Sequence, residues 1–117
     1  MASTTITASD PVTGNLTMSD NGNTNCKHDE LVTWVVLPTS GVDQITAISP
    51  KPDNINVFAT GPAKLSGASK NWQGTVKNSA SLPIPTPPGF VIENYNISWT
   101  DNAGNNHIFD PQIKVNP

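Results

Sequence analysis

The clearest strand signal in the chain is the run LVTWVVL at residues 31–37. It is apolar on both faces except at Thr33, which is typical of a central strand covered on both sides. Pro38 ends the run, because proline has no N–H to offer a sheet ladder, and the turn sequence TSG follows at residues 39–41. The sequence therefore predicts a buried strand near the centre of a sheet.

Shorter strand signals recur on both sides of this run, at the spacing typical of sandwiches and barrels. Residues 42–48 carry spaced apolar side chains among polar neighbours, and residues 95–99 place Tyr95, Ile97 and Trp99 on one face. No stretch keeps apolar residues at three-and-four spacing for more than a turn or two, so we expect no helix. Further candidate strands cover residues 4–7, 16–18, 55–58, 70–76, 108–109 and 113–115.

Turn signals separate these strands. Asn21-Gly22 accepts the positive φ angles of a tight hairpin turn, and Gly61-Pro62 marks a further turn. The stretch DNAG at residues 101–104 is typical of a hairpin turn. The proline-rich stretch at residues 79–89 predicts an extended surface crossing from one sheet to the other.

Together these signals predict an all-β fold of about seven to nine short strands, which is what a sandwich needs. The chain of 117 residues has the size of one domain and can bury a core of its own. We find no internal repeat and no domain boundary. The prediction is one domain over residues 1–117, a single two-sheet Greek-key β-sandwich.

Composition narrows the classes of function. The net charge is −3 and the six basic residues are scattered, which argues against nucleic-acid binding. Cys26 is the only cysteine, so the chain forms no internal disulfide. No apolar run reaches the length of a membrane span, and the chain as given shows no signal peptide. The compartment is unknown, and a cytoplasmic location is the default expectation.

Two segments resemble strands of the cupredoxin-like family of β-sandwiches. In that family an acidic residue precedes a V-x-[WF] strand, as in the run DELVTWV at residues 29–35. Its last hairpin begins Tyr-x-[aromatic or aliphatic]-x-Cys, passes a His and a Met, and ends on I-x-V. The corresponding residues here are 95–99, His107 and 113–115. The resemblance implies a two-sheet sandwich, and an immunoglobulin-like sandwich is the competing interpretation.

The departures from that family concern its copper site, which needs two His, a Cys thiolate and usually a Met. Trp99 stands where the ligand Cys would fall, and no His follows the strand at residues 31–37. Met1 and Met18 are not in the region of the axial ligand. The resemblance therefore implies a fold without blue-copper electron transfer.

Metal sites have few candidate ligands in this sequence. Cys26 and His28 could bind zinc or copper if His107 joined them, but zinc motifs normally pair their ligands at both ends. Residues 101–106 (DNAGNN) are rich in the oxygen ligands of calcium, yet they lack the closing acidic residue and match turn chemistry better. We expect no metal and no cofactor.

Catalytic chemistry has no local signature. A nucleophilic Ser or Cys would need a His base and an orienting carboxylate, and no Gly-x-Ser-x-Gly elbow is present. Spacing favours no pair of carboxylates for glycoside hydrolysis. We expect a protein that is not an enzyme. If it binds a ligand, the predicted contact residues are Trp72, Asp101, Asn102, Asn105 and His107.

The leading functional hypothesis is a non-catalytic structural or self-associating module, because only 13% of its residues are charged and a neutral surface permits close packing of subunits. Its partners would be further copies of the chain in a homo-oligomer. The alternative is a small carbohydrate- or protein-binding module that uses loops at one end of the sandwich. A weaker alternative is a cupredoxin-like metal-binding domain.

Overall fold

The computed structural model describes residues 2–52, 55–66, 69–83 and 89–116. These residues form ten strands, slightly more than the predicted number, and none of them forms a helix able to cross a membrane. The strands are β1 (Ala2–Ser9), β2 (Leu16–Met18), β3 (Asn23–Lys27), β4 (Leu31–Val36), β5 (Val42–Pro50), β6 (Phe58–Lys64), β7 (Trp72–Val76), β8 (Val91–Asp101), β9 (Asn106–Phe109) and β10 (Gln112–Asn116).

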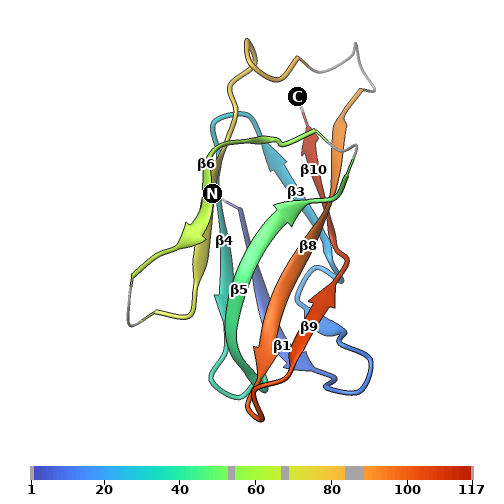
Figure 1. The fold of residues 1–117 in the computed structure, drawn as a ribbon. Helices are drawn as coiled ribbons and strands as arrows, with labels where there is room; N and C mark the ends of the chain where they lie inside the picture. Colours follow the sequence, from blue (N-terminus) through green and yellow to red (C-terminus); the bar gives the residue numbers. More distant parts are fainter. Residues whose placement is uncertain (1, 53–54, 67–68, 84–88, 117) are drawn as a thin grey trace.

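The strands form two packed sheets, as predicted (Figure 1). The first sheet has the order β2-β1-β4-β7-β6, and the second has the order β3-β10-β8-β5, with β9 beside β8. β8 pairs with β5 after β6 and β7 have crossed to the other sheet, which is a Greek-key connection. Two pairs, β1 with β4 and β3 with β10, are parallel.

The longest strand, β8, has two successive partners along one edge. β9 pairs with its last part, from Ile97 to Thr100, and β10 pairs with its first part, from Val91 to Asn94. Pro111 lies between β9 and β10, and its carbonyl accepts a hydrogen bond from the N–H of Tyr95 at 3.2 Å. β5 occupies the opposite edge of β8.

Alternating burial confirms the two strand signals that lead to this fold. Tyr95, Ile97 and Trp99 on β8 are fully buried on one face. β4 is central in its sheet, but only its inner face, with Trp34 at the middle, is fully buried, and its outer face is half-buried or exposed. The expectation that this strand is completely covered on both sides is therefore wrong.

One buried hydrogen bond joins the two sheets through the middle of the core. The indole N–H of Trp34, on β4, donates to the hydroxyl of Tyr95, on β8, at 3.1 Å. The ring of Phe58 packs against Trp34 with the ring centroids 5.7 Å apart. Burial raises the pKa of Tyr95 well above its ordinary value, so its hydroxyl stays neutral at any physiological pH.

Replacing Tyr95 by Phe removes the acceptor and leaves the Trp34 N–H buried without a partner. We expect Tyr95→Phe to lower the free energy of unfolding by about 1–3 kcal/mol, the usual cost of an orphaned buried polar group. Urea unfolding followed by tryptophan fluorescence measures this. In the background of Trp34→Phe the same change should cost less, and strictly additive effects of the two substitutions would contradict the assigned hydrogen bond.

Three features of the fold differ from the sequence-based expectations. β3 was not predicted, because its sequence NTNCK is polar and it gains its order from parallel pairing with β10. Gly61-Pro62 lies inside β6 instead of at a turn, at a point where the pairing register with β7 shifts. The turn at Asn21-Gly22 has the predicted positive φ angles of 58° and 78°, but it connects strands of different sheets.

The proline-rich stretch at residues 79–89 was predicted as a surface crossing, and its residues 84–88 lie outside the described part of the chain. Leu82, before that gap, is buried in the core. Glu93, on β8, is also buried, and its carboxylate accepts a hydrogen bond from the N–H of Val57 at 2.9 Å. Burial raises the pKa of Glu93.

Candidate functional site

Three connections between strands meet at one end of the sandwich, drawn at the bottom of Figure 1. They are the β1–β2 loop (residues 10–15), the β4–β5 turn (residues 37–41) and the β8–β9 hairpin (residues 102–105). We call this end the loop end. The opposite end holds the last residues of β3 and β10.

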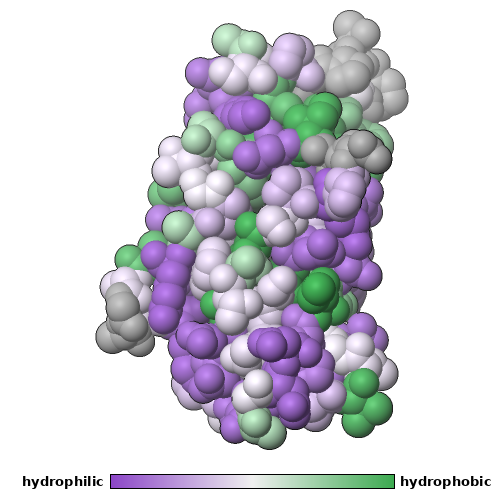
Figure 2. Space-filling model, viewed as in Figure 1, coloured by the Kyte–Doolittle hydropathy of each residue, from purple (hydrophilic) through white to green (hydrophobic). Residues whose placement is uncertain are grey.

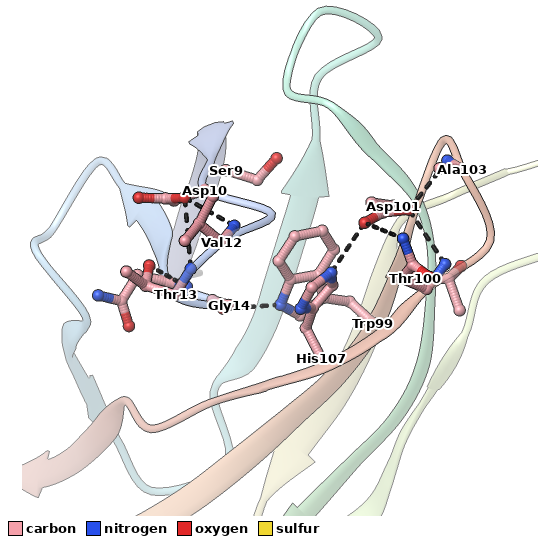
Figure 3. Close-up of polar contacts among 12 residues, drawn as sticks. Ser9, Asp10, Val12, Thr13, Gly14, Trp99, Thr100, Asp101, Ala103 and His107 are labelled. Atoms are coloured by element: carbon pink, nitrogen blue, oxygen red, sulfur yellow. Dashed lines mark hydrogen bonds and ion pairs between the residues drawn. The ribbon is translucent and has the colours of Figure 1, made fainter.

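Trp99 fixes the β1–β2 loop to the second sheet. Its fully buried indole N–H donates to the carbonyl of Gly14 at 3.0 Å, so β8 holds a loop that belongs to the first sheet (Figure 3). Gly14 has a φ of +82°, and a Cβ at this position would lie 3.4 Å from the Cβ of His107. A side chain at position 14 would thus be strained in backbone conformation and tight against His107.

His107 lies on β9 directly beside Trp99 and stacks on its indole ring. The ring centroids are 4.5 Å apart and the planes are inclined by 30°. The Nε2 atom of His107 is 2.8 Å from Oδ2 of Asp101, and the two side chains are only 13% and 8% exposed. The three side chains form a nearly closed base beneath the loops (Figure 3).

Asp101 organises the β8–β9 hairpin. Its carboxylate accepts hydrogen bonds from the backbone N–H groups of Ala103, at 2.9 Å, and Asn105, at 3.0 Å, and from the side chains of Asn105 and His107. These bonds, above all the one from His107, lower the pKa of Asp101 to about 2. Both carboxylate oxygens are therefore engaged within the hairpin, which matches turn chemistry better than a calcium loop.

The low pKa of Asp101 predicts how stability depends on pH. A carboxyl group whose pKa falls on folding stabilises the fold above its ordinary value of 3.8, and this stabilisation is lost as the pH falls through about 2. We expect Asp101→Asn to unfold at lower temperature at pH 7 and to show a flatter dependence of melting temperature between pH 4 and 2. Circular dichroism melts measure both effects.

Asp110→Asn is the matched control, since the Asp110 carboxylate is 65% exposed and pairs with Lys51 at the surface. It should change the melting temperature by less than Asp101→Asn. If the melting temperatures of wild type and Asp101→Asn depended on pH in the same way, this would contradict the role assigned to the Asp101 carboxylate.

The β1–β2 loop is held by its own first residue. Oδ1 of Asp10 accepts from the N–H groups of Val12, at 2.8 Å, and Thr13, at 3.3 Å, which lowers the pKa of Asp10. The backbone N–H of Asp10 donates to the carbonyl of Asn15 at 2.8 Å. Val12 is left 92% exposed at the tip of this ordered loop.

A pocket of about 530 Å³ lies between the three connections, and we call it the end pocket. It is lined by residues 8, 9 and 11, by residues 39–41, and by residues 101–103 and 105. The hydroxyl of Ser9 donates to the carbonyl of Ser40 at 2.7 Å, which joins two of the connections. Gly41 leaves room for this contact, because a Cβ there would lie 2.7 Å from the Ser9 hydroxyl.

The predicted contact residues separate into three groups. Asp101, Asn102 and Asn105 line the end pocket, whereas His107 lies beneath it as part of the base. Trp72 lies elsewhere, on β7 opposite Trp34, where it is half-buried against the core. Its indole N–H is buried and has no hydrogen-bond partner among the described residues.

The candidate metal ligands do not come together. Cys26 is buried beside β10, and burial raises the pKa of its thiol to about 12. The ring of His28 contacts the carbonyl of Leu82, with its Nε2 atom 2.8 Å away, while His107 lies at the loop end. Within the described ranges, no group of three His, Cys, Asp or Glu side chains could hold a metal ion.

Several residues that line the end pocket, among them Ala8, Ser9 and Pro11, carry no signal in the sequence for this position. Residues 39–41 were recognised as a turn, but nothing indicated that they face the hairpin at residues 101–105. Ser9 and Ser40 are 31 residues apart in the chain, so local sequence carries no signal for their contact.

No family model matches the chain, and no curated protein matches it either. Where the resemblance to cupredoxins implies a ligand cysteine, the chain has Trp99, with its indole bonded to Gly14. The choice between a cupredoxin-like and an immunoglobulin-like sandwich stays a prediction.

Proposed function

We propose that this chain is a non-catalytic binding module that holds its ligand in the end pocket. The observation that carries the proposal is the pocket itself, whose volume of about 530 Å³ falls in the range typical of ligand sites. It lies among loops at one end of a rigid sandwich, where binding residues are commonly found. It is the second hypothesis that the sequence suggests, a small binding module that uses loops at one end of the sandwich.

Preorganisation of the three connections supports this proposal. The carboxylates of Asp10 and Asp101 each satisfy several N–H groups of their own loop, and Trp99 holds the β1–β2 loop from below. A site whose loops are already ordered loses less conformational entropy when a ligand binds. The end pocket therefore has the rigidity that recognition by contact requires.

The lining of the end pocket favours a peptide group over a sugar ring. Most of its residues are small, such as Ala8, Gly41 and Ala103, and its polar groups are hydroxyls, amides and one carboxylate. No aromatic side chain lines it among the described residues, so a sugar would find no stacking platform. A short extended peptide with one inserted side chain matches this shape better.

The base of the pocket supports binding without catalysis. Asp101 and His107 are paired as in many catalytic sites, but the His107 ring is stacked on Trp99 and covered by Gly14. The Ser9 hydroxyl is directed to the carbonyl of Ser40 instead of to the imidazole. The pair is therefore better suited to hold the hairpin than to activate a nucleophile.

A pocket-filling substitution tests the proposed function. Ala103 is exposed and lines the end pocket, so Ala103→Phe should fill the space without disturbing the core. Ala80→Phe, at an exposed position away from the pocket, is the matched control. A library of short peptides and fragments is added to the wild type and amide NMR spectra are recorded. We expect some of these compounds, the hits, to shift the amide signals of pocket-lining residues.

Ala103→Phe should lower the affinity for those hits by about tenfold or more, equivalent to about 1.4 kcal/mol. Ala80→Phe should leave the affinity unchanged. Hits that map to other surfaces, or that survive Ala103→Phe, would contradict binding in the end pocket.

Self-association is the second candidate, favoured by the exposed Val12 at the tip of the β1–β2 loop. Figure 2 shows a hydrophobic spot at the lower right, where Figure 1 draws this loop. Three of the edge strands favour it less, whereas β3 and β9 have no such interruption. β6 contains Pro62, the register of β5 shifts twice, and β2 has only three residues. Such interruptions are the usual protection of edge strands against pairing with another copy.

Light scattering over a wide concentration range separates the two candidates. Because three of its edge strands are interrupted in this way, we expect the chain to keep a mass near 12.4 kDa throughout. A mass that grows with concentration, and that Val12→Asp returns to the monomer value, would favour self-association through the loop end. Val12 is almost fully exposed, so this substitution should not destabilise the fold.

A further inference from the structure

We infer that the end pocket receives a lysine side chain carried by an extended segment of a partner protein. This inference rests on the proposed function and adds the chemical class of the ligand. Two features of the loop end carry it, namely its charge and the small residues that line the pocket.

The negative charge of the chain is concentrated at the loop end. Along the chain, Asp10, Asp43 and Asp101 lie within its three connections or no more than two residues from them, and none of the six lysines does. The other six acidic residues balance the six lysines in the rest of the chain, so the net charge of −3 equals the charge of this end. Such a one-sided charge distribution attracts a cationic partner to this end.

The charge lies close to the pocket. Asp101 lines it, and its hydrogen bonds keep the carboxylate ionised at neutral pH. Asp10 precedes the lining residue Pro11, and the exposed Asp43 follows the lining residue Gly41 by two positions. A cation entering the pocket therefore meets the carboxylate of Asp101, and Asp10 and Asp43 stand within two residues of other lining residues in the chain.

The shape of the pocket suits lysine. Ala8, Pro11 and Ala103 offer an apolar wall to the four methylene groups of a lysine stem. Arginine gains most from a carboxylate that accepts two parallel hydrogen bonds, but both oxygens of Asp101 are already engaged by the hairpin. A compact ammonium group depends less on such a fork and can use hydroxyl and carbonyl acceptors.

Other ligand classes fit less well. An anion would face the carboxylate of Asp101, and no lysine is among the residues that line the pocket. A divalent cation would need a set of acidic or histidine ligands, and none exists among the described residues. A pocket of about 530 Å³ is also larger than one side chain, which leaves room for the backbone on either side of the lysine.

The test uses three capped pentapeptides that differ only at the central residue, which is lysine, norleucine or glutamate. Norleucine keeps the apolar stem and removes the charge. Each peptide is titrated into the full chain, and the amide NMR signals of Ala8, Ser40 and Ala103 are followed. We expect the lysine peptide to shift these signals and to bind about fivefold or more tightly than the norleucine peptide. Raising the salt concentration should reduce this difference.

Single charge removals locate the attraction. Asp43→Asn should weaken binding of the lysine peptide by about two- to fivefold and leave the affinity for the norleucine peptide unchanged. Asp10→Asn should weaken binding of the lysine peptide more than that of the norleucine peptide. The Asn side chain can still accept the hydrogen bonds that hold the β1–β2 loop. Asp110→Asn, on the connection between β9 and β10, is the control and should change neither peptide's affinity.

The outcomes separate this inference from the proposed function. Equal affinity of the lysine and norleucine peptides overturns the inference and leaves binding in the end pocket standing. An arginine peptide that binds more tightly overturns the preference for lysine, and free butylamine that binds as tightly as the peptide overturns the peptide partner. If neither the peptides nor any member of the fragment library shifts the pocket signals, both proposals are wrong.

Discussion

The hydrogen bond between Trp34 and Tyr95 is the contact on which the two sheets depend. Each sheet contributes one large aromatic side chain to the middle of the core, and each side chain carries a polar atom that cannot reach water. A packing that left the Trp34 N–H without a partner would lose about 1–3 kcal/mol, so this bond favours the arrangement of the sheets that pairs these atoms. Apolar burial holds the sheets together, and this bond fixes how they meet.

The loop end repeats the same arrangement closer to the surface. Trp99 again crosses from one sheet to the other, and this time its indole N–H meets a loop carbonyl at Gly14. Stacking of His107 on that indole brings the imidazole to Asp101, and Asp101 in turn shapes the hairpin above it. The pocket thus derives its geometry from the core through a short series of direct contacts, which is how a small rigid scaffold positions loops.

Sequence reasoning succeeded where the signal was local. The run at residues 31–37 and the alternation at residues 95–99 predicted β4 and β8, and DNAG predicted the hairpin turn at residues 101–104. It failed where order comes from distant partners. The polar β3 is a strand because β10 lies beside it, and the end pocket depends on contacts such as Ser9 with Ser40. Trp72 was a candidate ligand contact, and its half-buried position on β7 follows from the order of the strands in the sheet, which one sequence does not encode in any window.

The parallel pairing of β3 with β10 has a practical consequence. It makes β10 run away from the loop end, so Asn116 lies at the far end of a molecule 46 Å long. A dye, a surface tether or a fused reporter attached after this residue would leave the end pocket facing outward and unobstructed. Immobilised in this orientation, the chain presents its loops to solution uniformly, which suits it to surface-based assays and to display in ordered arrays.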